Sequence, residues 1–402
     1  MADSRFLDLL QASPDFIRNP YPAYAELRAQ GPAHRVRPPA REDSWLVVGH
    51  TACRDALADP RFSRDWHRNG QIGRIIQADE DNAALTHMLL RDPPDHTRLR
   101  KLVAKEFSMR RVDELRPRIQ QLTDELLDAM LDSPTRQADL IASFALPLPL
   151  RVICELLGIP AADQPAFSGW SNEIVARTSP EAEQRTYAEL TPYLAGLIAA
   201  KRNDPGDDLI SALIHTVDDD DGRLTEAELI GTCMVLVVAG HETTVNLIGN
   251  GVRALLAHPG QLALLRSDLD GLLPGAIEEM LRYDGPVETS TPRLTREPVE
   301  VSGCVIPAGE TVRMGLASAG RDPDRFADPD RFDITRNARG HMAFGHGIHY
   351  CLGAPLARLE SQIALRALLE RCPQLTAVVP EEELPWVEGF LVRGVRSLPV
   401  RW

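Results

Sequence analysis

The 402-residue sequence has no internal repeat, no low-complexity tract and no Pro/Gly/Ser-rich linker at which the chain would divide. Because 44% of its residues are hydrophobic, it can bury a large core. We therefore expect one large domain over residues 1–402. Positive charge is also in short supply. The net charge is −14, and an acidic chain of this kind is not expected to bind nucleic acid.

Long apolar runs are missing as well. The first residues, MADSRFLDLLQASPDF, have neither a basic start nor a sustained apolar core, so we expect no secretion signal. The longest apolar stretch, Cys233 to Ala239, is far too short to cross a bilayer. These absences predict a cytoplasmic protein without a membrane anchor.

Cysteine is scarce and shows no metal-binding pattern. None of the six cysteines forms a C-x-x-C pair or has the spacing of zinc ligands. Five of them lie in helix-like or strand-like contexts, where a cysteine usually acts as a small hydrophobic filler. The exception is Cys351.

Cys351 lies in the segment FGHGIHYCLG, residues 344–353, directly before an apolar helix expected from Ala354 to about Leu369. The unpaired N–H groups and the positive dipole end at the start of a helix favour a thiolate. Glycines in the same segment leave the backbone open to a flat, bulky ligand. A thiolate against a flat ligand is the arrangement that holds haem iron for O–O cleavage.

Taken alone, Cys351 has two other interpretations. A cysteine before a helix is often only a buried small hydrophobe. A nucleophilic cysteine with His349 as its base is the second alternative, although such a base usually comes from elsewhere in the fold. The residues of this loop by themselves leave both alternatives open.

Helical periodicity predominates from residue 94 to about 282, with breaks at 147–149, 160, 179–180 and 204–206. Earlier segments predict helices at 22–30 and 51–58 and a strand at 45–48, and the residues after 282 predict short strands at 299–301 and 311–313. The expected fold class is mainly α with small β regions.

A long apolar helix is expected from residue 225 to residue 257, with Thr225 and Glu228 at capping-box spacing. In its middle, the sequence AGHETT places Gly240 in a helix interior, where Gly costs about 1 kcal/mol relative to Ala. The Thr243 hydroxyl can bond the Ala239 carbonyl one turn back and bend the helix. The resulting notch suits a diatomic ligand, or alternatively a neighbouring helix.

The string F-x-x-G-x-H-x-C-x-G resembles the haem-binding loop of the cytochrome P450 family, and A-G-x-E-T-T resembles its oxygen-binding groove. The resemblance covers nearly the whole chain and is strongest to soluble actinobacterial P450s that hydroxylate macrolides and other polyketides. It implies the P450 fold, a thiolate-ligated haem b and O2 as co-substrate. It also implies that the protein is a monooxygenase, which inserts one oxygen atom of O2 into a C–H bond.

The resemblance also assigns roles to residues. It implies that Cys351 ligates the iron, that Thr243 steers protons to bound dioxygen and that Glu242 relays them from solvent. It implies a structural Glu–Arg–Arg network built from E-x-x-R and the following P-x-R-F. The other implied positions are the haem contacts Phe344, Ala239 and Gly240, the propionate partners His96, Arg100, Arg293 and His349, and the network Glu279, Arg282 and Arg331.

By the same resemblance, the substrate lies against residues 66–90, 174–184, 287–291 and 390–392 and the middle of the long helix. The contacts that we expect are Val237, Val287, Thr291 and Leu391. Asp79, Glu80 and Asp81 in the first of these segments carry a further hypothesis, that they bind the cationic amino sugar of a macrolide. A solvated acidic loop is the alternative.

Electrons are expected from a ferredoxin and a ferredoxin reductase, because no flavin or iron–sulfur module is fused to the chain. A basic segment with Arg98, Lys101, Lys105, Arg110 and Arg111 predicts where an acidic ferredoxin docks. We expect a monomer. Two alternative functions remain: a haem-thiolate enzyme for epoxidation, oxidative coupling or peroxide-driven oxidation, and a non-catalytic haem sensor.

Overall fold

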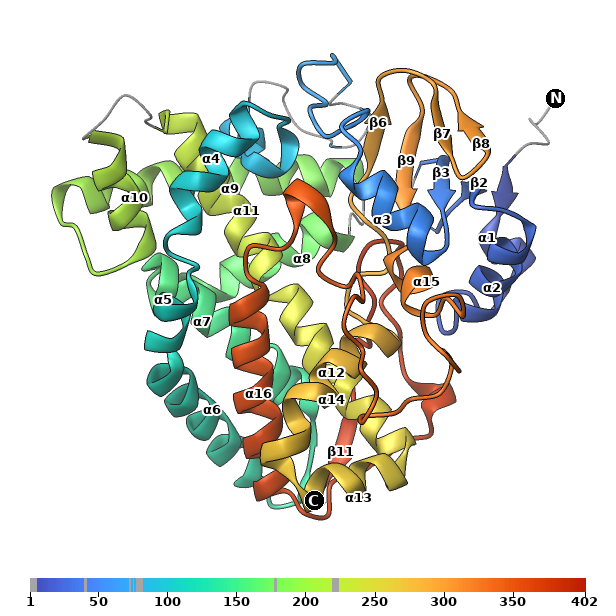
Figure 1. Cartoon of the computed structure of the whole chain (residues 1–402). Coiled ribbons are helices and arrows are strands. Elements are labelled where there is room, and N and C mark those ends of the chain that lie inside the picture. Colours follow the sequence, from blue (N-terminus) through green and yellow to red (C-terminus); the bar gives the residue numbers. More distant parts are fainter. Residues whose placement is uncertain are drawn as a thin grey trace. The chain divides into compact units, whose positions relative to one another are not determined.

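The structure is a computed structural model that describes residues 6–39, 42–71, 74, 76, 82–176, 179–218 and 224–402 (Figure 1). The chain forms two compact units. The first comprises residues 1–62, 118–146 and 243–402, and the second comprises 63–117 and 147–242. The expectation of one domain over residues 1–402 stays a prediction. The fold class is confirmed, because helices predominate and the sheets are small.

The first unit holds the sheets and the C-terminal helices. Its helices are α1 (Leu9–Ala12), α2 (Tyr21–Gln30), α3 (His50–Ala58), α6 (Arg116–Leu131), η4 (Ile141–Ala145), α12 (Glu242–Ala257), α13 (Pro259–Ser267), α14 (Leu269–Asp284), α15 (Leu316–Gly320), η6 (Gly347–His349), α16 (Ala354–Arg371) and η7 (Glu381–Glu383). Its strands are β1 (Leu7–Asp8), β2 (Ala33–Arg37), β3 (Ser44–Val47), β4 (Phe62–Ser63), β5 (Gln137–Asp139), β6 (Arg293–Thr295), β7 (Val299–Val301), β8 (Cys304–Ile306), β9 (Thr311–Met314), β10 (Thr376–Ala377) and β11 (Pro399–Arg401).

Strands from both ends of the sequence form the main sheet, in the order β1-β2-β3-β9-β6-β4. Trp45 of β3 pairs in parallel with Val312 of β9, and Arg293 of β6 pairs with the same Val312 from the other side. Buried Val47, Met314 and their neighbours pack against α3 in one apolar cluster. The sheet thereby fixes Arg293, one of the predicted haem-binding residues, next to α3.

Apart from Ser63 of β4, the regular elements in the described part of the second unit are helices. Its elements are η2 (Ala83–Leu85), η3 (Met88–Leu90), α4 (Asp95–Ala104), α5 (Met109–Glu114), α7 (Pro147–Leu157), η5 (Ala161–Asp163), α8 (Gln164–Ala176), α9 (Pro180–Asn203), α10 (Leu209–Asp218) and α11 (Glu226–Gly240). Helix α11 is buried from residue 228 to residue 237, in contact with η2, α7, α8 and α9. Apolar residues occupy all sides of this stretch of the helix, as is typical of a helix that is buried in a protein core.

The predicted long helix is present and is interrupted where the sequence predicts a bend. It divides at His241 into α11 and α12. The predicted capping box is confirmed, since the Glu228 N–H donates to Thr225 Oγ1 at 3.2 Å and the Thr225 N–H donates to Glu228 Oε2 at 2.8 Å. The joined segment Glu226–Ala257 is long and apolar enough to cross a membrane, but most of it is buried inside the protein.

Candidate functional site

Cys351 lies in a loop that closes on itself before α16. Its backbone N–H donates to the Phe344 carbonyl at 2.9 Å, and the turn η6 lies within the closed loop. The residue is half-buried and precedes Ala354, the first residue of α16, as the sequence predicts. A thiol at this place lies near the positive end of the helix dipole, which favours its thiolate form.

Two glycines of this loop have left-handed backbones for different reasons. Gly345 and Gly347 have φ values of 72° and 74°, which favour glycine. A Cβ on Gly347 would lie 2.8 Å from the Leu57 carbonyl oxygen of α3, so that glycine permits close packing against α3. A Cβ on Gly345 would meet nothing nearer than the His349 carbonyl at 4.0 Å. Gly345 is therefore the position that is open to a flat ligand.

Four of the other five cysteines are poor candidates for a ligand. Burial raises the pKa of Cys154 and of Cys233 to about 12. Burial also raises the pKa of Cys53 and of Cys372 above the ordinary value. A thiol that resists ionisation neither attacks nor binds metal, so these four residues fill the core, as the sequence predicts.

Phe344, at the start of the cysteine loop, is held by a polar cluster that was not predicted. The Arg358 guanidinium of α16 lies 4.4 Å from the Phe344 ring centroid. Arg358 Nε donates to Glu278 Oε1 of α14 at 2.6 Å, and His341 Nε2 lies 3.0 Å from Glu278 Oε2. Burial opposes ionisation of Glu278, but the hydrogen bonds from Arg358 and His341 outweigh it and lower its pKa to about 2. The cluster joins both sides of the loop to α14.

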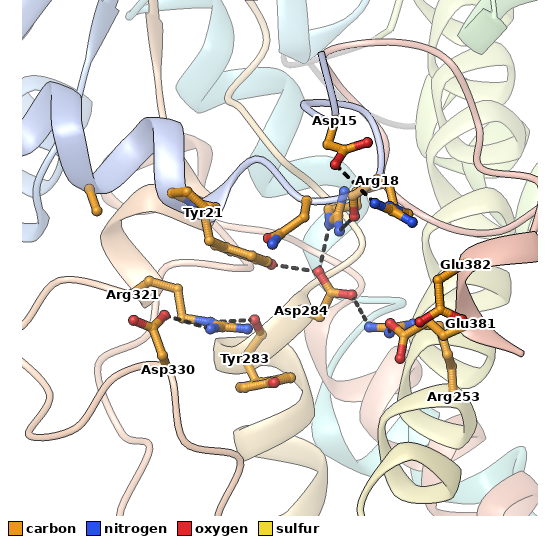
Figure 2. A pocket seen from close by; sticks show the side chains of 14 residues that line it. Asp15, Arg18, Tyr21, Arg253, Tyr283, Asp284, Arg321, Asp330, Glu381 and Glu382 are labelled. Atoms are coloured by element: carbon orange, nitrogen blue, oxygen red, sulfur yellow. Dashed lines mark hydrogen bonds and ion pairs between the residues drawn. The ribbon is translucent and has the colours of Figure 1, made fainter. Parts of the chain in front are cut away.

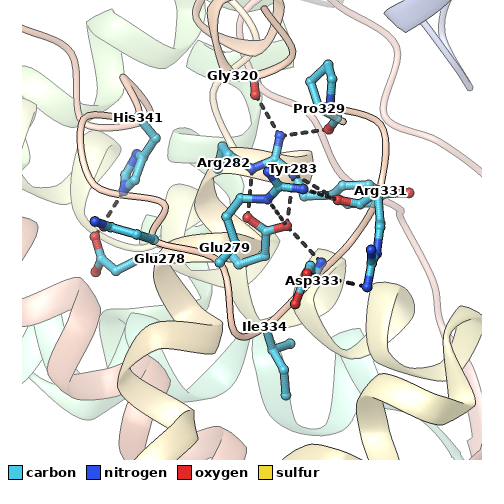
Figure 3. A network of polar contacts seen from close by, with 12 residues as sticks. Glu278, Glu279, Arg282, Tyr283, Gly320, Pro329, Arg331, Asp333, Ile334 and His341 are labelled. Atoms are coloured by element: carbon cyan, nitrogen blue, oxygen red, sulfur yellow. Dashed lines mark hydrogen bonds and ion pairs between the residues drawn. The ribbon is translucent and has the colours of Figure 1, made fainter. Parts of the chain in front are cut away.

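The predicted E-x-x-R pair forms the centre of a buried network (Figure 3). Arg282 donates from Nε to Glu279 Oε2 at 2.7 Å and from Nη2 to Glu279 Oε1 at 2.8 Å. Both side chains are fully buried. Arg282 Nη1 also donates to the carbonyls of Gly320 and Pro329, each at 2.8 Å. A paired charge is tolerated in the interior because its remaining donors are used in this way.

The second guanidinium of this network belongs to Arg336, and the prediction of Arg331 was wrong for the side chain. Arg336 Nε lies 3.3 Å from Glu279 Oε1. The Arg331 side chain is 66% exposed and pairs with Asp333 at 3.6 Å, so only its backbone carbonyl accepts bonds from Arg282 and Arg336. The chain turns at 331 so that its carbonyl faces the network, which directs the side chain outward.

The notch in the long helix has a packing role at Gly240. A Cβ there would lie 3.0 Å from Cγ1 of Ile153 in α7, so the glycine lets α7 approach. The next residue, His241, is buried, and its Nδ1 lies 3.1 Å from the Val237 carbonyl of the last turn of α11. The neighbouring-helix alternative thus accounts for the missing side chain of Gly240.

The two predicted proton-transfer residues follow this break. Burial raises the pKa of Glu242, which suits a group that must both hold and release a proton. Thr243 is the next residue and begins the last segment of the first unit, residues 243–402, whereas Ala239 belongs to the second unit. The hydroxyl–carbonyl bond between Thr243 and Ala239 stays a prediction.

The predicted propionate partners are divided between the units. In the first unit, buried Arg293 donates from Nη1 to the Leu57 carbonyl at 3.0 Å, and the loop that carries His349 packs against the same carbonyl through Gly347. In the second unit, His96 and Arg100 share α4. Burial, and then the charge of Arg100, lower the pKa of His96.

Two of the expected substrate-contact segments lie side by side. Val287 forms an antiparallel bridge with Val392, and the Glu288 N–H donates to the Leu391 carbonyl at 2.8 Å. Thr291 follows in the same segment. Val237 is buried in α11. The acidic residues of the amino-sugar hypothesis, Asp79, Glu80 and Asp81, lie outside the described residues.

A family model described as cytochrome P450 matches residues 197–393. The chain is 56% identical over 397 residues to the cytochrome P450 monooxygenase PikC of Streptomyces venezuelae, an alignment that covers 98% of this chain and 94% of PikC. The chain belongs to the cytochrome P450 family. Members of this family are haem-thiolate proteins, and its named relatives are monooxygenases.

Two further P450s show how far the likeness extends. The 6-deoxyerythronolide B hydroxylase of Saccharopolyspora erythraea is 46% identical over 390 residues, with 95% of each chain covered. The solved structure of the tirandamycin C-bound P450 monooxygenase TamI is 45% identical, with a TM-score of 0.89 over 98% of this chain and 99% of TamI. The chain shares its fold with TamI, and its enzyme class is that of the P450 monooxygenases.

The residues of the first unit fit a thiolate-ligated haem. A half-buried cysteine at a helix start can supply the thiolate, the lack of a side chain at Gly345 leaves the backbone open there, and buried Arg293, bonded to the Leu57 carbonyl against which the loop packs, is a cation for a carboxylate. Sequence reasoning missed Glu278, His341 and Arg358. The available signal was Arg358, which lies about one turn into α16 and places a cation beside the loop.

Proposed function

We propose that this P450 hydroxylates a C–H bond of a macrolide or other polyketide, with haem b bound through Cys351. The observation that carries the proposal is the closed loop from Phe344 to Cys351 at the start of α16. The substrate class is supported by the likeness to the 6-deoxyerythronolide B hydroxylase. We place the protein in the cytoplasm and expect a monomer.

Bound haem supplies the oxidising centre at which O2 is cleaved. In this proposal Cys351 holds the group, and Arg293, His349, His96 and Arg100 neutralise its carboxylates. Phe344, held by the Arg358–Glu278 cluster, keeps the cysteine loop in place.

In the second unit, Ala239 and Gly240 would line the notch that receives oxygen. Glu242 takes protons from solvent, and the Thr243 hydroxyl passes them on. The raised pKa of Glu242 supports this assignment because it brings the carboxyl closer to the pH at which it can both take up and release a proton. Val237, Val287, Thr291 and Leu391 contact the substrate.

The first test is a spectral titration of the ferric protein against macrolides and other polyketides. Displacement of the water ligand by a substrate should shift the haem from low to high spin. The carbonyl complex of the reduced protein should have the Soret position of a thiolate-ligated haem. A spectrum typical of histidine ligation would show that Cys351 is not the iron ligand. If the protein is a haem sensor and not an enzyme, no hydroxylated product should form when electron donors are present.

Replacing Thr243 with alanine tests the proton path. Product formed per reductant consumed should fall by roughly tenfold, because positioned proton transfer typically contributes a factor of that size or more. The neighbouring Thr244, which is buried, provides the matched control Thr244→Ala. Equal coupling in the two variants would reject the role of Thr243.

We propose that a ferredoxin, itself reduced by a ferredoxin reductase, docks on the basic segment of the second unit. Lys101 and Lys105 are exposed there. Arg98 has another role, since it pairs with Glu228 at the start of α11, and Arg111 pairs with Glu106 and Glu114. Arg110 also pairs with Glu114, at 3.8 Å. The docking charge of the proposed segment thus falls mainly on the two lysines.

Reversing both lysines, Lys101→Glu with Lys105→Glu, should slow reduction by a ferredoxin and reduce its dependence on salt. The control reverses Arg396 and Arg401, which are also exposed, and changes the net charge equally. Stopped-flow reduction at several ionic strengths measures the effect. The same rates in both double variants would place the docking site elsewhere.

A further inference from the structure

The two segments that carry the proposed contacts Val287, Thr291 and Leu391 form a short ladder. Besides the Val287–Val392 bridge and the bond from Glu288 to Leu391, the Thr289 hydroxyl donates to the Phe390 carbonyl. The ladder continues where the Arg393 N–H donates to the Pro286 carbonyl at 2.9 Å. Its width sets how far apart the two contact segments lie.

A buried ion pair joins the two segments at one end of this ladder. Asp284, the last residue of α14, lies three residues before the first segment, and Arg393 directly follows the second. Arg393 Nε donates to Asp284 Oδ1 at 2.6 Å, and both side chains are nearly inaccessible, at 3% and 2% exposure. The same carboxylate accepts the Tyr21 hydroxyl at 2.5 Å and pairs with Arg253 of α12.

Arg393 also makes contacts that only a guanidinium can make together. Nη1 donates to the Ile17 carbonyl at 2.9 Å and Nη2 donates to the Arg18 carbonyl at 2.8 Å, while the planar group lies 4.3 Å from the Trp386 ring centroid. Lysine has one charged nitrogen and no plane, so it cannot replace these bonds and the stacking at once. The position of Arg393 is therefore determined from three directions.

The α12 helix fixes the backbone at the same place. Asn250 Nδ2 donates to the carbonyls of both Asp284 and Arg393, at 3.1 and 3.0 Å. Arg393 and Arg253 outweigh the effect of burial and hold the pKa of Asp284 well below its usual range. Figure 2 shows Asp284 between Tyr21 and Arg253 in the wall of a cavity of about 650 Å³. On its outer side, Arg253 also pairs with Glu381, whose side chain is 46% exposed.

We propose that Asp284 and Arg393 are positioning residues for the substrate. Their ion pair fixes the separation of the segments 287–291 and 390–392 and so determines which part of a bulky substrate can approach the haem. This inference rests on the proposed function, because the contacts it positions belong to that proposal. Neither residue is a catalytic residue.

The test compares two ferric ligands in the haem-loaded protein. Imidazole reaches iron without touching much of the pocket wall, whereas 4-phenylimidazole must fit its ring against that wall. In Arg393→Lys and Asp284→Asn, the Kd of 4-phenylimidazole should rise by roughly fivefold to tenfold, about the worth of one hydrogen bond, with the Kd of imidazole unchanged. Tyr21→Phe removes one bond to Asp284 and should give a smaller change in the same direction.

Glu381→Gln is the matched control, since it loosens the outer partner of Arg253 and leaves the Asp284–Arg393 pair intact. It should bind both ligands as the unaltered protein does. An unchanged ratio of the two Kd values in Arg393→Lys, or an equal loss for both ligands, would overturn the inference. If Arg393→Lys and Asp284→Asn do not fold, an unchanged ratio in Tyr21→Phe has the same consequence. A reduced carbonyl spectrum without thiolate character in the unaltered protein would instead refute the proposed function.

Discussion

Glu288 provides a prediction whose size follows from its surroundings. Its carboxyl is buried between the ladder and α2, where it accepts the Tyr24 hydroxyl at 2.5 Å. Burial raises its pKa from 4.5 to about 7, although Arg393 and the bond from Tyr24 act in the opposite direction. Between these two values the folded protein keeps a proton that the unfolded chain releases.

The proton on Glu288 stabilises the folded protein at low pH. The contribution of the Glu288 proton is fully present below pH 4.5 and is lost as the pH rises through about 7. The complete loss corresponds to roughly 3 kcal/mol, of which roughly 2 kcal/mol falls between about pH 5.5 and about pH 8. Glu288→Gln keeps an acceptor for Tyr24 and cannot ionise, so this variant should gain roughly 2 kcal/mol relative to the unaltered protein over that interval.

Urea unfolding of the haem-loaded proteins at the two pH values measures this difference. The exposed Glu300 of β7 provides the control Glu300→Gln, which corrects for the change in net charge. A stability difference between Glu288→Gln and the unaltered protein that stays constant with pH would show that Glu288 is charged in the fold throughout. A difference that falls with rising pH would contradict the reasoning outright.

Two further predictions concern packing and charge. Arg336→Ala should lower the free energy of unfolding by about 1–3 kcal/mol, because it removes a hydrogen bond from buried Glu279. Arg331→Ala removes only an exposed ion pair and should cost less than about 1 kcal/mol. Urea unfolding measures both losses, and equal losses would show that the Arg331 side chain belongs to the network. Gly240→Ala should destabilise by about 1–3 kcal/mol through overpacking against Ile153. In a double-mutant cycle Ile153→Ala should relieve most of that cost, and strictly additive losses would refute the contact.

Local signals in the sequence predicted local structure well. The capping box of Thr225 and Glu228 and the break beside Gly240 are both encoded within a few residues, and both occur as predicted. The start of α9 at Ser179-Pro180 is marked in the same way, since the Ser179 hydroxyl accepts from the third residue of the helix.

Non-local pairing accounts for most of what the sequence did not predict. The strand β2 reads as a polar stretch, and it forms because β3 and β9 complete a sheet beside it. Arg331 and Arg336 are five residues apart in an irregular segment, where no helical or strand period tells which side chain turns inward. The Glu278–Arg358 pair joins α14 to α16, and neither helix carries a sequence motif that indicates contact with the other.

The described contacts of the first unit make α14 the helix that connects the cysteine loop to the substrate segments. Glu278 holds Arg358 and His341 beside Phe344, and Glu279 and Arg282 hold the irregular chain before the loop. Two residues after Arg282, Asp284 holds the ladder through Arg393. Glu278 and Arg282 differ by four positions and so project from one face, whereas Asp284 projects from another. A single rigid helix can thus set the cysteine loop and the pocket wall independently, and changes at Asp284 should alter selectivity without disturbing the thiolate.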